Sequence, residues 1–288
     1  MFVIIGLVIV IGSILAGYVM HGGNIMVLVQ VTEFIIIGGS GIGSVLIANP
    51  PSAVAATVKS LIGLLKGNPY KKETYMELLQ MLYDMFIMAR REGLVSLDQH
   101  VENPHDSKFF SSYGFFFAHH HALSFLADTM KVVITGSVAN HDLSELMDID
   151  LETTHEEILK PSGIIQNLGD SMPGFGIVAA VLGVVITMGK IGGPPEEVGH
   201  SVAAALVGTF LGILLAYGML NPMAAALTGQ AKCEEQYMNC IKCALLSFAR
   251  GDAPLTAVEF ARRNIDPGCR PSFSEMESTV KGAAAKAA

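Results

Sequence analysis

The sequence predicts an all-α protein with four membrane-spanning helices and a helical domain on the cytoplasmic side. Hydrophobic residues make up 51% of the 288-residue chain and charged residues only 15%, against about 25% charged in ordinary soluble domains. The missing charges leave four long apolar runs, whereas a long stretch between the second and third runs has many charges and helical periodicity. Basic residues gather on one side of the runs, which gives the chain a predicted direction.

The four apolar runs are the predicted spans. They are Phe2–Met20, Phe34–Ala48, Met172–Met188 and Val202–Met223. The first covers nineteen residues without a charge, enough to cross about 30 Å of hydrocarbon as a helix. The second is short and stops at Asn49-Pro50-Pro51, because proline interrupts helical hydrogen bonding. We therefore expect it to be extended by residues from Val27–Val31 or Ala53–Val58.

Lysine and arginine positions predict the orientation of the spans. The loop His21–Val31 has neither residue, and the loop after the third run has only Lys190, so seventeen of the eighteen basic residues lie on the other side. Because basic loops stay in the cytoplasm, both termini and the large loop are predicted to be cytoplasmic. The predicted segments are 1–58 with two transmembrane helices, 59–170 as a cytoplasmic helical domain, 171–228 with two further transmembrane helices, and 229–288 as a cytoplasmic C-terminal helical segment.

Composition and spacing also exclude several function classes. The net charge of −8 argues against nucleic acid, whose phosphates require a basic face. His119-His120-His121 on one helix would point about 100° apart and could not share a metal ion. The four cysteines lie in the C-terminal quarter and form one C-x-x-C without a second pair, so we expect reduced thiols and no zinc. No nucleophile–base pair or cofactor motif is evident, so no enzyme activity and no cofactor are predicted.

The cytoplasmic part is predicted to begin with an amphipathic helix at Lys72–Arg91. Its apolar residues recur at three- and four-residue steps, and Gly93 is a plausible C-cap. Arg90 lies in the last turn, and Asp98 lies in the first turn of a helix that begins near Ser96. One interpretation is that these charges complement the helix dipoles. The alternative is that Arg90 and Asp98 form an exposed charged ridge that meets a partner protein.

The predicted spans hold few ionisable groups. Glu33 lies at the outer edge of the second span and Asp170 at the inner edge of the third, so no carboxylate is predicted at mid-membrane, where an ion path would need one. The spans instead carry two small-xxx-small motifs, which let helices approach closely. They are Gly39 with Gly43, and Gly208 with Gly212.

Three further residues in the spans have two interpretations each. Thr209 either donates a hydrogen bond to a carbonyl of its own helix or lines a hydrated path formed with another subunit. Pro173, at the start of the third span, and Pro222, at the end of the fourth, are either ordinary helix punctuation or a pair of hinges. As hinges they would pass a change in the membrane to the cytoplasmic domain.

The sequence resembles the MotA family of flagellar stator subunits, within the wider MotA/TolQ/ExbB proton-channel class, over essentially the whole chain. The resemblance rests on long ordered motifs. They are Gly17-Tyr-Val-Met-His-Gly-Gly, Ile37-Gly-Gly-Ser-Gly-Ile-Gly-Ser, Val101-Glu-Asn-Pro, Pro173-Gly-Phe-Gly-Ile-Val-Ala-Ala-Val-Leu-Gly-Val-Val, Val207-Gly-Thr-Phe-Leu-Gly-Ile-Leu-Leu-Ala-Tyr-Gly and Pro271-Ser-Phe. Asp98 stands where the family often has glutamate, and the triple histidine is peculiar to this chain.

The resemblance implies a bacterial inner-membrane ring of five such chains around two MotB-type subunits, which supply the missing mid-membrane carboxylate. Protons would drive the ring, and cytoplasmic charges would push the rotor protein FliG. By this resemblance, Arg90 and Asp98 match the rotor-facing charges, Pro173 and Pro222 the coupling prolines, and Thr209 the channel-lining threonine. Closeness to the proton-type pattern favours protons over sodium.

Three other functions compete with a flagellar stator. An ExbB/TolQ-like energy-transducing subunit is the nearest alternative, but those chains typically have three spans. A self-sufficient transporter would need its own mid-span carboxylate. A membrane enzyme would need catalytic or metal-binding spacing that this sequence does not have.

Overall fold

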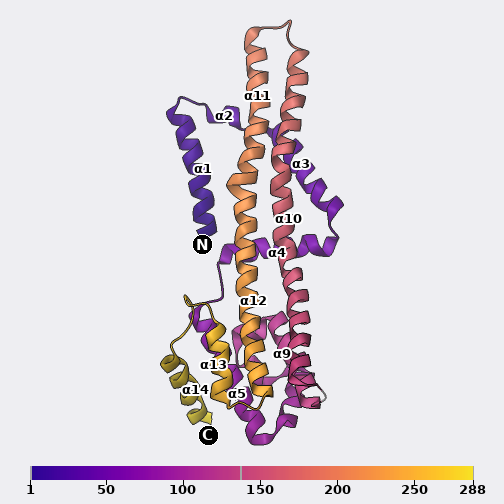
Figure 1. Ribbon diagram of the computed structural model, residues 1–288. Helices are drawn as coiled ribbons and strands as arrows, with labels where there is room; N and C mark the ends of the chain where they lie inside the picture. Colours follow the sequence, from indigo (N-terminus) through magenta and orange to yellow (C-terminus); the bar gives the residue numbers. More distant parts are fainter. Residues whose placement is uncertain (1, 137, 288) are drawn as a thin grey trace. The chain divides into compact units, whose positions relative to one another are not determined.

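The computed structural model describes residues 2–136 and 138–287, with side chains as far as Gly282. Met1, Ser137 and Ala288, which fall in the predicted segments 1–58, 59–170 and 229–288, lie outside the described residues. Every regular element in the described ranges is a helix (Figure 1). This confirms the predicted all-α class. The chain divides into two compact units, one formed by residues 1–67 and 159–230 and the other by residues 68–158 and 231–288.

Four helical stretches in the described residues are long and apolar enough to cross a membrane. They are Phe2–Met20, Ile25–Ala48, Asn140–Met188 and Pro195–Ala249. The first and second contribute whole helices to the first unit, which we call the apolar unit. The third and fourth are longer than a bilayer requires, and each has residues in both units.

The apolar unit begins with four separate helices. They are α1 (Phe2–Met20), α2 (Ile25–Leu28), α3 (Val31–Ala48) and α4 (Pro51–Lys66). The second predicted span is extended at its N-terminal end, because α3 starts at Val31. It is not extended beyond Pro50, which is extended in conformation and caps α4 as a separate helix. Figure 1 shows α4 lying across the direction of α3.

The rest of the apolar unit comes from the two long stretches. Helix α10 (Asn140–Met188) is continuous, and a short turn leads into α11 (Pro195–Ile213). A π-helix at Leu214–Leu220 then joins α11 to α12 (Asn221–Ala249) without a break. Figure 1 shows α10 and α11 running side by side.

Both predicted hinge prolines lie inside these continuous helical stretches, and the punctuation interpretation is therefore wrong. Pro173 falls deep within α10, which also contains Pro161. Pro222 is the second residue of α12, directly after the π-helix. The apolar runs begin at Met172 and end at Met223, but the helices continue beyond both limits.

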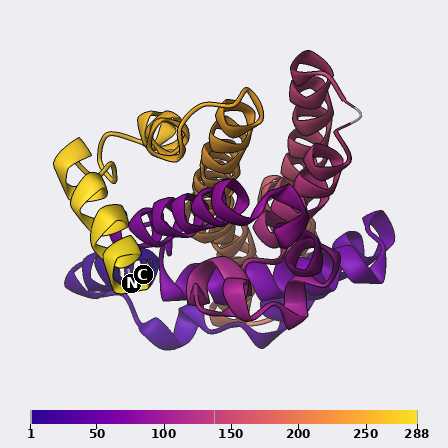
Figure 2. The same ribbon diagram turned by 90° about the horizontal axis from the view of Figure 1, so that it is seen from below.

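The second unit, which we call the polar unit, holds the main hydrophobic core. Its elements are α5 (Lys72–Glu92), short helical turns from Leu94 to Ala118, α9 (His120–Thr135), the first part of α10, most of α12, α13 (Pro254–Asn264) and α14 (Phe273–Ala287). Both α13 and α14 pack on α5, and Figure 2 shows α14 beside α5.

Helix α5 confirms the predicted amphipathic helix. Its buried residues are Tyr75, Leu78, Leu79, Met81, Leu82, Met85, Phe86 and Ala89. Gly93 caps it with φ of 88°, a backbone conformation that glycine adopts without a steric cost. The face that periodicity predicted is thus the face that the core buries.

Candidate functional site

Glycines bring α10 and α11 into backbone contact in the apolar unit. A Cβ on Gly176 would lie 2.8 Å from the carbonyl oxygen of Gly208 and 3.2 Å from the Cα of Gly212. A Cβ on Gly212 would lie 2.6 Å from the carbonyl oxygen of Met172. Because backbone atoms cannot give way as side chains do, only glycine fits here. The sequence motif found Gly208 and Gly212, but not Gly176, whose partners are far away in the chain.

The other glycine motif behaves differently. A Cβ on Gly39 or Gly43 would meet nothing within 4 Å, whereas one on Gly41 would collide with the side chain of Met172 and lie 3.1 Å from Leu168 Cδ1. The close approach of α3 to α10 is therefore made by Gly41. Packing through Gly39 and Gly43 stays a prediction for contact with another chain.

Glu33 is the acidic side chain buried in the apolar unit. It is 5% exposed, and its Oε2 has no hydrogen-bond partner among the described residues. This oxygen lies 2.5 Å from the position of a Cβ on Gly208. Its position in the first turn of α3 agrees with the predicted edge of the span, but the contact with the interior of α11 was not predicted, because long-range contacts leave no local pattern.

Thr209 is half-buried next to this contact. Its Cα lies 3.4 Å from the position of a Cβ on Gly176. Its hydroxyl makes no hydrogen bond within the described part of the chain, whereas Thr187 Oγ1 donates to the Gly183 carbonyl at 2.8 Å. The interpretation of Thr209 as a back-bonded hydroxyl is therefore wrong. The hydroxyl is free to bind water or another chain.

Arg90 and Asp98 lie in the polar unit, near the end of α5. Both are exposed. Arg90 Nη2 donates to the Gly251 carbonyl at 3.1 Å, while Asp98 starts the short helix α6 (Asp98–Glu102) and has no ion pair in the described ranges. Both charges complement helix ends, as the dipole interpretation expects. Between them, Val95 is 77% exposed, so the region presents charge and one apolar side chain to solvent.

The triple histidine has a geometry that differs from the one predicted from the sequence. His119 lies before α9 as its N-cap, so the three residues are not on one helix. Its Nδ1 accepts from the Ala122 N–H at 3.3 Å, and its Nε2 lies 2.7 Å from the Tyr70 hydroxyl. His121 Nδ1 is 2.9 Å from Glu234 Oε1, and His119 Nε2 is 3.5 Å from the same oxygen.

These contacts determine how the two histidines titrate. Burial lowers the pKa of His119, and its Nδ1 is occupied by a backbone N–H, so the neutral ring with Nε2 as donor fits best. The hydrogen bond with Glu234 raises the pKa of His121. No group of three or more ligating side chains in the described residues has the geometry of a metal site.

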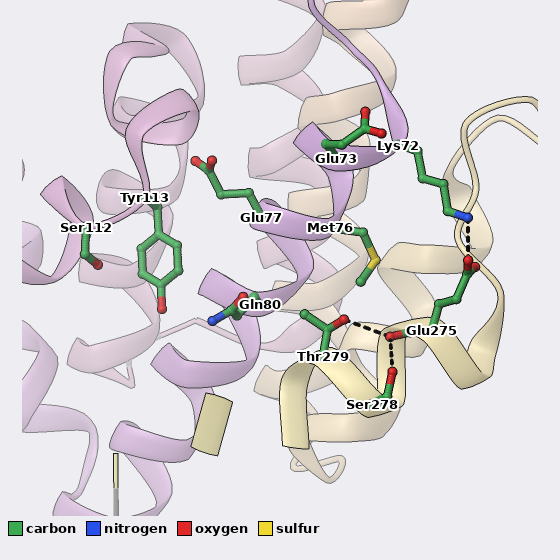
Figure 3. Close-up of a pocket in the computed structure, with 10 residues that line it drawn as sticks. All are labelled: Lys72, Glu73, Met76, Glu77, Gln80, Ser112, Tyr113, Glu275, Ser278 and Thr279. Atoms are coloured by element: carbon green, nitrogen blue, oxygen red, sulfur yellow. Dashed lines mark hydrogen bonds and ion pairs between the residues drawn. The ribbon is translucent and has the colours of Figure 1, made fainter. Parts of the chain in front are cut away.

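An open groove of about 750 Å³ lies between α5 and α14 in the polar unit. Figure 3 shows the ion pair of Lys72 with Glu275 at its edge, 2.6 Å long. Glu77 accepts the backbone N–H groups of Phe115 and Phe116, and the Tyr113 hydroxyl donates to Asp84. The polar groups of the groove therefore hold the fold together and do not form a nucleophile–base pair.

Comparison with known families gives two matches that follow one another along the chain. Residues 4–93 match the motility protein A N-terminal family. Residues 118–240 match the MotA/TolQ/ExbB proton channel family.

Similar proteins extend the comparison to nearly the full length. The chain is 40% identical to motility protein A of Salmonella typhimurium and to that of Escherichia coli, in each case over 98% of this chain and 95% of the relative. It is 33% identical to the chemotaxis protein LafT of Vibrio parahaemolyticus, over 95% and 96%.

Two solved structures share the fold. One is described as C. jejuni MotAB, with a TM-score of 0.74, 22% identity and coverage of 94% of this chain and 98% of that one. The other is the flagellar MotAB stator complex from Bacillus subtilis, with a TM-score of 0.70, 24% identity and coverage of 89% and 92%.

Proposed function

This chain belongs to the motility protein A family of flagellar stator subunits, and we propose that it forms a proton channel with a MotB-type partner whose proton flow turns the rotor. The observation that carries this proposal is the 40% identity over 98% of the chain, together with four helical stretches able to span a membrane. The family is one of channel and stator proteins, not of enzymes.

In this proposal the apolar unit forms the channel, and the partner subunit supplies the group that carries the proton. Glu33 is buried but lies in the first turn of α3, and its Oε2 lies against Gly208, the residue before Thr209. A path across the membrane needs an ionisable group along its length, so a carboxylate from the partner subunit would complete the path that Thr209 lines. We further propose five copies of this chain around two partner subunits, with Gly39 and Gly43 packing against neighbouring chains.

The polar unit would carry the force to the rotor protein FliG through Arg90 and Asp98. Orientation follows from the basic residues, seventeen of which lie on one side of the predicted spans. Because such residues tend to stay in the cytoplasm, we propose that the chain lies in a bacterial inner membrane with both termini and the polar unit on the cytoplasmic side. Segments 59–170 and 229–288 are then the cytoplasmic parts of the stator.

The energy of one proton is large enough for such coupling. One elementary charge crossing 100 mV releases about 2.3 kcal/mol, which corresponds to about a 50-fold change in an equilibrium constant. Pro173 and Pro222 lie within the helical stretches that connect the two units. We propose that they allow the bend by which a proton passing the channel moves the polar unit.

The ExbB/TolQ-like alternative fits less well, since the N-terminal match is to motility protein A and the chain has a fourth span. Deletion of the gene tests the proposal. Swimming is expected to stop while stained flagella remain intact, because a stator is needed for rotation and not for filament assembly. Bald cells, or cells that still swim in the absence of any other stator, would contradict it.

A further inference from the structure

A polar contact joins α10 to α12 beside both predicted hinges. Asn221 Nδ2 donates to Asp170 Oδ1 at 3.1 Å. Gln166 Nε2, one turn earlier on α10, donates to both oxygens of Asp170 at 3.0 and 3.2 Å. Asp170 precedes Pro173 by three residues, and Asn221 precedes Pro222 directly. The contact therefore connects the two helices at the level where each carries its proline.

The fit around Asn221 requires close backbone approach. Its Oδ1 is buried without a hydrogen-bond partner among the described residues. A Cβ on Gly169 would collide with this oxygen and would lie 3.2 Å from the Cβ of Leu220. Glycine at position 169 thus lets the amide of Asn221 lie against α10, and any larger residue would displace it.

The backbone next to Asn221 has fewer α-helical hydrogen bonds than its surroundings. The π-helix Leu214–Leu220 ends where the Asn221 N–H bonds to the carbonyl of Ala216, five residues back. Pro222 has no N–H, so the α-helical bond to the Gly218 carbonyl cannot form. Short π-helical segments are rare and often occur at functional sites. The side chain of Asn221 therefore anchors the helix where its own backbone bonding is weakest.

We infer that Asp170 and Asn221 are positioning residues, a clamp that sets the register of α12 against α10 during force transmission. An amide whose buried acceptor oxygen has no partner is a costly way to pack two helices. Compared with apolar packing, this contact adds a directional hydrogen bond to a charged group. Such a bond is either formed or broken, so it can define two states of the helix pair. The inference rests on the proposed stator function. It adds to the proposed hinges at Pro173 and Pro222 a hydrogen bond that connects their two helices.

The test uses the full-length chain with its MotB-type partner in stator-deleted cells. Asn221→Ala breaks the clamp, and Gln166→Ala is the matched control, because it removes donors to Asp170 but leaves the bond between the helices. A fluorescent tag counts assembled stators, and bead rotation at low load measures the rate of the coupled step. Asn221→Ala is expected to lower that rate about ten-fold, the factor a lost hydrogen bond to a charged group can produce. Gln166→Ala should rotate normally.

Exchanging the two residues gives a second test, whose result a role in general packing would not predict. Asp170→Asn and Asn221→Asp should each slow rotation alone, while the double variant restores a donor–acceptor pair with reversed polarity and should recover most of the rate. Normal rotation by Asn221→Ala, or no recovery in the double variant, would overturn the inference. Failure of the unmodified chain to restore rotation would instead overturn the proposed function.

Discussion

The two units of this chain differ in how each is packed internally. The polar unit buries a continuous core of large side chains, among them Phe86, Phe110 and Tyr237. Among its described residues, the apolar unit has two small buried clusters, and α1 buries none of its residues. Its backbones meet at glycines, and its large apolar side chains point outward. In water the polar unit has the ingredients of an independent fold, whereas the apolar unit needs lipid or other chains to cover it.

The largest effect is expected when a large side chain is removed from the hydrophobic core of the polar unit. Phe86 is fully buried and stacks on Phe248 with ring centroids 4.3 Å apart. Phe86→Ala should destabilise the polar unit by about 3–5 kcal/mol, measured by thermal unfolding of the purified chain. Val95→Ala, at a side chain 77% exposed, is the control and should stay within about 0.5 kcal/mol. Similar losses for both variants would mean that the core is not where the structure places it.

The apolar unit should be destabilised when a side chain is added at a glycine contact between helices. Gly212→Ala would place a Cβ 2.6 Å from the Met172 carbonyl oxygen, while Gly39→Ala meets nothing within 4 Å of this chain. The first should cost about 1–3 kcal/mol by overpacking. It is measured as lower resistance of the detergent-solubilised chain to unfolding. An equal effect of Gly39→Ala on the isolated chain would show that α3 packs differently.

How far the sequence predicts each unit follows from the same difference. Periodicity located the buried face of α5, because amphipathic helices repeat their apolar residues every three or four positions. Continuous apolar runs located the spans, because the hydrophobicity of a span is a property of one local segment. These patterns did not find Gly176, Gly41 or the burial of Glu33, since these depend on which helices meet. Nor did they predict that His119 lies outside α9, because an N-cap histidine has no sequence signature of its own.

The histidine cluster allows a pH test within the polar unit. The pKa of His121 is raised above its usual value by the hydrogen bond with Glu234. Its stabilising contribution is therefore complete below about pH 6.5 and is lost as the pH rises through the raised pKa. The melting temperature of the unmodified chain should exceed that of His121→Gln more at pH 6 than at pH 9.

Burial, and to a lesser extent the neighbouring charge of His121, lower the pKa of His119, so acid destabilises both the unmodified chain and His121→Gln through this ring. His120→Gln, at an exposed ring outside the contact with Glu234, is the matched control and should differ equally from the unmodified chain at both pH values. A difference for His121→Gln that grows with pH would contradict the assignment.

The smallest effect is expected at the surface of the polar unit. Lys72 and Glu275 form an ion pair with side chains 45% and 50% exposed, and hydrogen bonding to Lys72 lowers the pKa of Glu275 to about 2. Water and salt screen such pairs strongly. Lys72→Ala should leave the melting temperature nearly unchanged at low salt and unchanged at about 1 M salt. A large loss would show that α14 depends on this pair and not on its apolar contacts with α5.

The most direct test of the stator account is proton flux through purified protein in vesicles. The chain alone should leave a pH gradient intact, and co-reconstitution with its MotB-type partner should dissipate it, because we propose that the partner supplies the carboxylate that completes the path. Rapid dissipation by this chain alone would contradict the account. Loss of that flux in Glu33→Gln would then identify Glu33 as the chain's own proton carrier.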